Sequence, residues 1–147
     1  MGAVSSGHLD DLPPWARALL ERERSGHLGV VDDDEHPRVL PVTFALAGGE
    51  LASAVDEKPK RAPGAELARV RWLRRQPAAA LTVDHYDDDW SRLAWVQALG
   101  RIELAEVSDH PQALAALQAK YAPYRDRAPP GPLLLLRPQR LLWWRAG

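Results

Sequence analysis

The chain has 147 residues, of which 46% are hydrophobic and 27% are charged, and its formal net charge is −1 at pH 7. This length suits one globular domain, so we expect a single domain over residues 1–147, with residues 1–10 flexible. The absence of cysteine excludes disulfides, thiolate catalysis and cysteine-ligated zinc. The balanced charge gives no attraction to nucleic acid, and no segment has the ~18–20 apolar residues of a membrane span or the layout of a signal peptide. We therefore expect a cytoplasmic protein with no nucleic-acid or membrane partner.

The first half of the chain predicts two helices separated by three strands. Asp10 or Asp11 is expected to cap the first helix, which has prolines near its first turn and continues to about Arg24. A Gly-Gly pair at positions 48 and 49 indicates a hairpin. The expected strands cover residues 27–31, 38–47 and 51–55, with an acidic turn at 32–37. The second helix covers 66–76 and ends before a proline.

The second half predicts four more strands and one more helix. The strands cover residues 78–84, 93–106, 133–136 and 140–145, and residues 137–139 form a turn between the last two. Ser108 or Asp109 caps a helix that continues to about Tyr121, and Gly100 indicates a bulge or a close backbone approach. This succession predicts a mainly β (α+β) fold, an antiparallel six- to seven-stranded split β-barrel with two or three flanking helices. The expected core includes Val30, Val42, Phe44, Leu81, Val83, Val96 and Leu135.

A cluster of three cations follows the third expected strand. Lys58, Lys60 and Arg61 come directly after the apolar run at 52–55, and a proline between them restricts the backbone. Fixed positive charge at a strand end suits a phosphate, because Lys and Arg neutralise it and Arg can bind two of its oxygens. The alternative is a solvated basic turn.

Other motifs are excluded by their spacing. The acidic loop that starts at Asp84 lacks the glycine and glutamate of a calcium loop, since its sixth and twelfth positions hold Asp89 and Trp95. The five histidines are scattered, and phosphate-loop and serine-nucleophile motifs are absent, so we expect no metal site and identify no catalytic residue. The basic residues of the second helix are expected to form a solvated face: Arg69, Arg71, Arg74 and Arg75.

Three segments resemble a known family. They are residues 38–44 (RVLPVTF), 54–61 (AVDEKPKR) and 76–86 (QPAAALTVDHY), followed by the more specific DHYDDDWSR at 84–92. Together they are similar to the pyridoxamine 5′-phosphate oxidase-like (PPOX-class) split β-barrels, the FMN-binding split barrels. Within these they most resemble the F420-dependent branch of actinobacteria. The resemblance extends from about Leu12 to Arg145.

The resemblance implies a homodimer that binds two cofactors at the subunit interface and acts on a small-molecule substrate. Pro41, Val42 and Thr43 would lie along the cofactor ring, and Ser53, Ala54 and Val55 would line the same groove. Lys58, Lys60 and Arg61 would hold the phosphate of the cofactor tail. Trp90 and Trp144, in the C-terminal 143–145 segment, would reach the pocket from the partner subunit.

Three functions remain open at this stage. The first is an F420-dependent oxidoreductase that transfers a hydride between the deazaflavin and an unidentified organic substrate. The second is an FMN-binding oxidoreductase or carrier of the same fold. The third is a binding module without turnover that sequesters the deazaflavin. The residues do not separate the first two, because both cofactors present a phosphate and a tricyclic ring.

Overall fold

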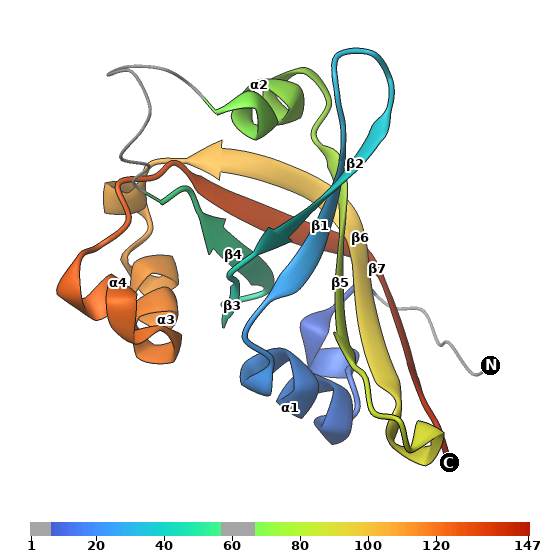
Figure 1. Ribbon diagram of the computed structural model, residues 1–147. Helices are drawn as coiled ribbons and strands as arrows, with labels where there is room; N and C mark the ends of the chain where they lie inside the picture. Colours follow the sequence, from blue (N-terminus) through green and yellow to red (C-terminus); the bar gives the residue numbers. More distant parts are fainter. Residues whose placement is uncertain (1–6, 57–66) are drawn as a thin grey trace.

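The computed structural model describes residues 7–56 and 67–147. These residues form seven strands in one antiparallel sheet, with four α-helices around it (Figure 1). The strands are β1 (Gly26–Val31), β2 (Pro37–Val42), β3 (Ala45–Ala47), β4 (Glu50–Ala54), β5 (Ala78–His85), β6 (Ala94–Ala105) and β7 (Leu133–Arg145). The helices are α1 (Pro14–Arg22), α2 (Ala68–Arg75), α3 (Pro111–Lys120) and α4 (Ala122–Asp126). The predicted mainly β, antiparallel split-barrel class is confirmed.

The two edges of the sheet are consecutive in the chain. The strand order is β2-β1-β5-β6-β7-β4-β3, so β2 and β3 lie at opposite ends of the order. Only Thr43 and Phe44 separate these two strands in the sequence. Two residues cannot cross a flat seven-stranded sheet, whose strands are about 4.8 Å apart. The sheet must therefore curl until its two edges come close together. The edge strands β2 and β3 are not paired with each other, and we call the junction between them the split of the barrel.

Two strand predictions were wrong in their continuity. The single strand expected over 38–47 is broken at Thr43 and Phe44, because the chain changes from one sheet edge to the other there. The two strands expected at the C-terminus are one strand, β7, with no turn at 137–139. Pro138 is accommodated because it lies opposite Gly100, where the β6–β7 register shifts at a bulge. The bulge predicted at Gly100 is confirmed.

The predicted helix caps were also wrong. Asp10 and Asp11 belong to the short 3-10 helix η1 (Leu9–Asp11), and α1 starts at Pro14. The predicted caps of the later helix lie in η3 (Val107–Asp109), and α3 starts at Pro111. In both cases the helix starts at a proline, whose φ angle suits the first turn. Proline lacks a backbone N–H, but an N–H at this position would have no partner within the helix, so no hydrogen bond is lost. The sequence did not predict α4, and none of the described helices is long and apolar enough to cross a membrane.

The core has two parts, on the two faces of β7. All seven predicted core residues are buried, six of them in the larger cluster and Leu135 in a smaller cluster beneath α3 and α4. Leu134 and Leu136 belong to the larger cluster, whereas Leu133 and Leu135 belong to the smaller one. Successive side chains of a strand point to opposite faces, so a run of four leucines is expected where both faces are covered.

The bulge generates a stability prediction. A Cβ atom at Gly100 would collide with the carbonyl oxygen of Arg137, whereas one at Gly49 would meet nothing within 4 Å. Gly100→Ala should lower the free energy of unfolding by about 1–3 kcal/mol, because backbone must move to make room. Gly49→Ala is the matched control and should change it far less. Urea denaturation followed by circular dichroism measures both, and equal effects would contradict the close approach.

Candidate functional site

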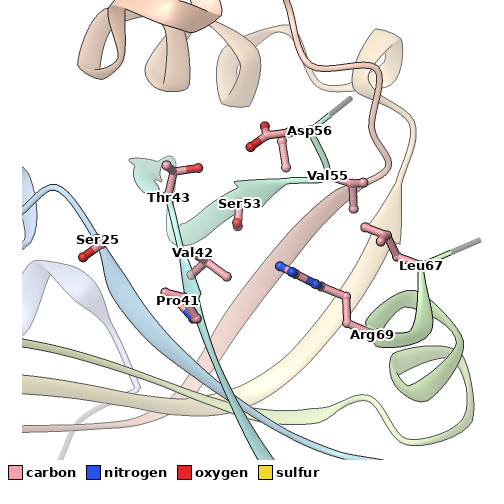
Figure 2. A pocket seen from close by; sticks show the side chains of 10 residues that line it. Ser25, Pro41, Val42, Thr43, Ser53, Val55, Asp56, Leu67 and Arg69 are labelled. Carbon is pink, nitrogen blue, oxygen red and sulfur yellow. The ribbon is translucent and has the colours of Figure 1, made fainter. Parts of the chain in front are cut away.

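A pocket of about 240 Å³ opens where the ends of β2 and β4 face the start of α2 (Figure 2). We call it the β2–β4 pocket. Its walls combine hydroxyl, apolar and charged side chains with the backbone of an edge strand. The residues that line it are Ser25, Pro41, Val42, Thr43, Ser53, Ala54, Val55, Asp56, Leu67 and Arg69.

Six of the residues predicted from the sequence meet in this pocket. They come from two segments of the chain, Pro41, Val42 and Thr43 from the end of β2 and Ser53, Ala54 and Val55 from the end of β4. The structure brings the two segments together because β2 ends at the split and the end of β4 extends beyond its pairing with β3, which stops at Ala52. Their contact with a cofactor stays a prediction.

Among the other predicted residues, the two tryptophans, which the structure describes, are not in the lining of this pocket. Lys58, Lys60 and Arg61 lie outside the described residues. Trp90 is in η2 (Trp90–Arg92) with 69% of its surface exposed, and Trp144 pairs with Trp95 near the far end of β7. β7 leaves the pocket region at Leu133, which pairs with Ala54, so Trp144 is roughly 35 Å further along the strand at about 3.3 Å per residue. A role for Trp90 and Trp144 therefore requires a second subunit.

The backbone at the split is held by the hydroxyl group of Tyr121, the residue after α3. The Phe44 N–H donates to Tyr121 Oη at 3.0 Å, and the carbonyl oxygens of Phe44 and Arg24 both lie 3.0 Å from the same Oη. Tyr121 is 6% exposed, and burial raises its pKa. A side chain thus satisfies backbone groups that a neighbouring strand would satisfy in a continuous sheet.

Tyr124 of α4 holds Thr43, the residue before Phe44, on the pocket side. Its Oη lies 2.7 Å from Thr43 Oγ1 and 2.6 Å from Asp56 Oδ1, which joins the end of β2 to the residue beyond β4. Burial, and then the hydrogen bond to Asp56, raise the pKa of Tyr124 to about 12. The rings of Tyr121 and Tyr124 pack edge to face with their centroids 5.6 Å apart. The two tyrosines therefore fix both residues of the split.

Lys120, the last residue of α3, contacts Phe44 and α1. Its Nζ lies 3.7 Å from the centre of the Phe44 ring and donates to the Leu20 carbonyl oxygen at 2.9 Å. Burial, and then the charge of Arg24, lower the pKa of Lys120 to about 8. These contacts hold Phe44, which is fully buried, against α1 and α3.

Helix α2 is anchored by its buried Val70, Trp72 and Leu73, and charged contacts join it to the β1–β2 hairpin. Arg75 Nη1 donates to Glu35 Oε1 at 2.8 Å, and the guanidinium also contacts the Asp32 carbonyl oxygen. Arg38 stacks on the Trp72 ring at 4.7 Å. Asp32 organises the turn, because its carboxylate accepts the backbone N–H groups of Asp34 and His36. The bond from His36 contributes most to lowering its pKa.

This docking carries Arg69 to the pocket. The prediction that all four arginines of α2 form a solvated face is wrong for Arg69, which extends from the first turn of α2 toward Ser53 and Val42 (Figure 2). Arg69 lies three and four residues before the buried Trp72 and Leu73, so it shares their face of the helix. That spacing was the signal that could have placed it. Tyr121 and Tyr124 carried a weaker signal, since only their i, i+3 spacing marks a common face.

The residues present suit a planar ring with an anionic tail. β2 is an edge strand, which leaves backbone groups available to a ligand, and Val42 and Val55 supply apolar contacts. Arg69 supplies positive charge. The volume of about 240 Å³ lies below the ~300–1,000 Å³ typical of sites that enclose a ligand. This pocket is therefore too small to enclose such a ligand by itself.

The comparisons with known proteins agree with this fold. A family model described as pyridoxamine 5′-phosphate oxidase matches residues 15–133. A heme binding protein from Mycobacterium smegmatis has a TM-score of 0.70 at 21% identity, over 92% of this chain and 56% of that one. A FAD-binding protein from Mesorhizobium loti has 0.65 at 17% identity, over 100% of both chains. A protein named F420 reductase has 0.60 at 24% identity, over 88% of this chain and 98% of that one. No curated protein matches the chain.

The tyrosine bonds at the split predict a loss of stability on removing one oxygen atom. Tyr121→Phe leaves the buried N–H of Phe44 without its partner, which should cost about 1–3 kcal/mol of unfolding free energy. Tyr86→Phe is the matched control, because Tyr86 is 65% exposed, and it should have almost no effect. Urea titration compares the two variants with the parent protein. A neutral Tyr121→Phe would mean that water replaces the hydroxyl at the split.

Proposed function

This chain belongs to the pyridoxamine 5′-phosphate oxidase family, and we propose that it is an F420-dependent oxidoreductase of that family. It transfers a hydride between the deazaflavin cofactor and a small organic substrate, both held at the β2–β4 pocket. FMN is the alternative cofactor. The alternative function is an FMN-binding oxidoreductase, or a carrier of flavin or deazaflavin.

The observation that carries this proposal is the make-up of the pocket wall. Two segments that resemble the cofactor-binding segments of the family border one pocket, and Arg69 adds a cation to it. The ten residues that carry Lys58, Lys60 and Arg61 join Asp56 to Leu67, and both of these line the pocket. Coenzyme F420 is preferred because the motif at 84–92 resembles the F420-dependent branch. The structural similarity to a protein named F420 reductase adds support.

The protein's part in this reaction is to bind and orient. When bound, the cofactor supplies the hydride, and the chain needs no catalytic triad or metal of its own. The backbone from Pro41 to Thr43 would lie along the ring, and the valines beside it would exclude water. Arg69, with the cations after Asp56, would hold the phosphate through charge-assisted hydrogen bonds. Asp56 is the one carboxylate among the described lining residues, and it is bonded to Tyr124.

A second copy of the chain would complete the site. The pocket is smaller than a site that encloses a ligand, and Trp90 and Trp144 lie too far away to reach it within one chain. Val39, on the edge strand β2, is 67% exposed, and Trp90 is 69% exposed. Exposed apolar and aromatic side chains are typical of the centre of an interface. We therefore propose a homodimer with two sites.

The first experiment identifies the cofactor. The absorption spectrum and mass of any molecule that co-purifies are recorded, and the purified protein is then titrated with coenzyme F420 and with FMN. The proposal expects F420 to bind more tightly than FMN. Tight binding of FMN alone would favour the alternative function, and binding of neither would refute both.

The pocket cation predicts the effect of a substitution. Arg69→Ala should weaken cofactor binding about ten- to a hundredfold, because it removes a charge-assisted contact. Lys60→Ala and Arg61→Ala should do the same if the cation cluster holds the phosphate. Isothermal titration with F420 and FMN measures the affinities.

Arg74→Ala is the control for these substitutions, because Arg74 is an exposed residue of the same helix and does not line the pocket. It should leave the affinity unchanged. Its melting temperature without cofactor should also stay within a degree or two of the parent protein, since an exposed charge contributes little to folding. A larger loss from Arg74→Ala than from Arg69→Ala would place the phosphate elsewhere.

The proposed assembly predicts a dimer at micromolar concentration in sedimentation velocity. Val39→Asp should shift it toward the monomer, because the substitution places a charge in the exposed edge of β2. Asp88→Asn, at an exposed loop position, is a control that should leave the mass unchanged. A parent protein that sediments as a monomer contradicts the shared site.

A further inference from the structure

Thr43 is the pocket residue whose hydroxyl group is tied most closely to the rest of the fold. Thr43 and Asp56 both line the β2–β4 pocket, and Tyr124 lies behind them with 7% of its surface exposed. The three side chains form one chain of hydrogen bonds, with Thr43 Oγ1 2.7 Å from Tyr124 Oη and Tyr124 Oη 2.6 Å from Asp56 Oδ1. Both distances are those of strong O–H···O bonds.

The direction of these bonds follows from counting protons. The Asp56 carboxylate has no proton to give, so the proton of Tyr124 must lie between Tyr124 and Asp56. Tyr124 can then only accept from Thr43, and the proton of the Thr43 hydroxyl is committed to that bond. The pKa of Tyr124, raised to about 12 by burial and by Asp56, agrees with a tyrosine that keeps its proton. Toward a ligand, Thr43 Oγ1 can then offer only its lone pairs, as a hydrogen-bond acceptor.

We propose that Thr43 meets the ligand as a hydrogen-bond acceptor, so that the β2–β4 pocket selects a ring with an N–H or O–H donor at that position. This inference rests on the proposed function, and it names the chemistry by which that site recognises its ligand. Flavin and deazaflavin rings both carry an imide N–H between two carbonyl groups. Heme offers no such donor, because its polar groups are carboxylates, which only accept when ionised.

The same chain of bonds is unsuited to delivering a proton. A proton passed from Thr43 to a substrate would be replaced from Tyr124, which would leave a phenolate beside the Asp56 carboxylate. Two like charges in a buried position oppose that step. Tyr124 is thus a positioning residue that acts through Thr43, and Asp56 sets the direction of its bond.

The test compares rings that differ only in the donor. The probes are FMN and coenzyme F420, each with its N3-methylated analogue, titrated against the parent protein, Thr43→Val and Thr82→Val. Thr43→Val keeps the shape of the side chain and removes the acceptor. It should weaken binding of the unmethylated ring about three- to tenfold and leave the methylated ring unaffected, so the discrimination between them collapses. Thr82→Val is the matched control, because Thr82 bonds to Gln97 on β6 and does not line the pocket.

Tyr124→Phe tests whether Tyr124 acts through Thr43. It should weaken binding of the unmethylated ring in the parent background and have no further effect in a Thr43→Val background, which is a coupled double-mutant cycle. Additive effects would overturn the positioning role. Thr43→Ala is a second variant, with the same expected loss of discrimination, if Thr43→Val does not fold.

The outcomes separate the two proposals. If the parent binds one of the rings and Thr43→Val retains its full discrimination, the acceptor role is overturned while the proposed function stands. If the parent binds neither ring, the proposed function is refuted and this inference with it. If the parent binds hemin more tightly than either ring and Thr43→Val does not change that, the donor requirement is wrong.

Discussion

The two-residue connection between β2 and β3 is the constraint on which the rest of this structure depends. Thr43 and Phe44 join strands that occupy opposite edges of the sheet, so the sheet has to close on itself. Closing by hydrogen bonds would pair β2 with β3 and leave no opening. Instead the hydroxyl of Tyr121 bonds to both backbone groups of Phe44, and the split stays open as a pocket.

The helices have separate tasks around that split. Tyr121, directly after α3, and Tyr124 of α4 place their hydroxyl groups at the junction. Each of these buried hydrogen bonds matters for stability, because a buried donor without a partner costs more free energy than the bond contributes. α2 lies across the β1–β2 hairpin and is held there by the ion pair of Arg75 with Glu35 and by Arg38 on Trp72. These surface contacts are individually weak. Together with the buried Val70, Trp72 and Leu73 of the same helix, they set the position of Arg69 relative to the pocket.

The arrangement explains how one fold can serve different planar ligands. The structurally similar proteins are named for heme, FAD and F420, and what they share with this chain is the fold. An open split with an edge-strand backbone accepts a flat ring without dictating its chemistry. Any selection of one flat-ring ligand over another must then come from the polar residues at the rim of the pocket. Under the proposed function these are Thr43, with its proton turned away from the pocket by Tyr124 and Asp56, and the cation Arg69.

The amino-acid sequence by itself determined most of the strands, the bulge at Gly100, the predicted core residues and two of the segments that line the pocket, because alternation, glycine and local motifs report on neighbours along the chain. It failed where the reason lies far away in the chain. The break after Val42 is invisible locally, because Phe44 and Ala45 continue the apolar pattern. It lies where the chain passes from one edge of the sheet to the other, and the backbone there is bonded by a tyrosine hydroxyl 77 residues after Phe44. Arg69 looked solvated because its neighbours in sequence are charged, whereas the docking of α2 on the hairpin decides which way it points. Only the tertiary structure could decide the hydrogen-bond direction at Thr43, since that direction requires Thr43, Asp56 and Tyr124 in contact.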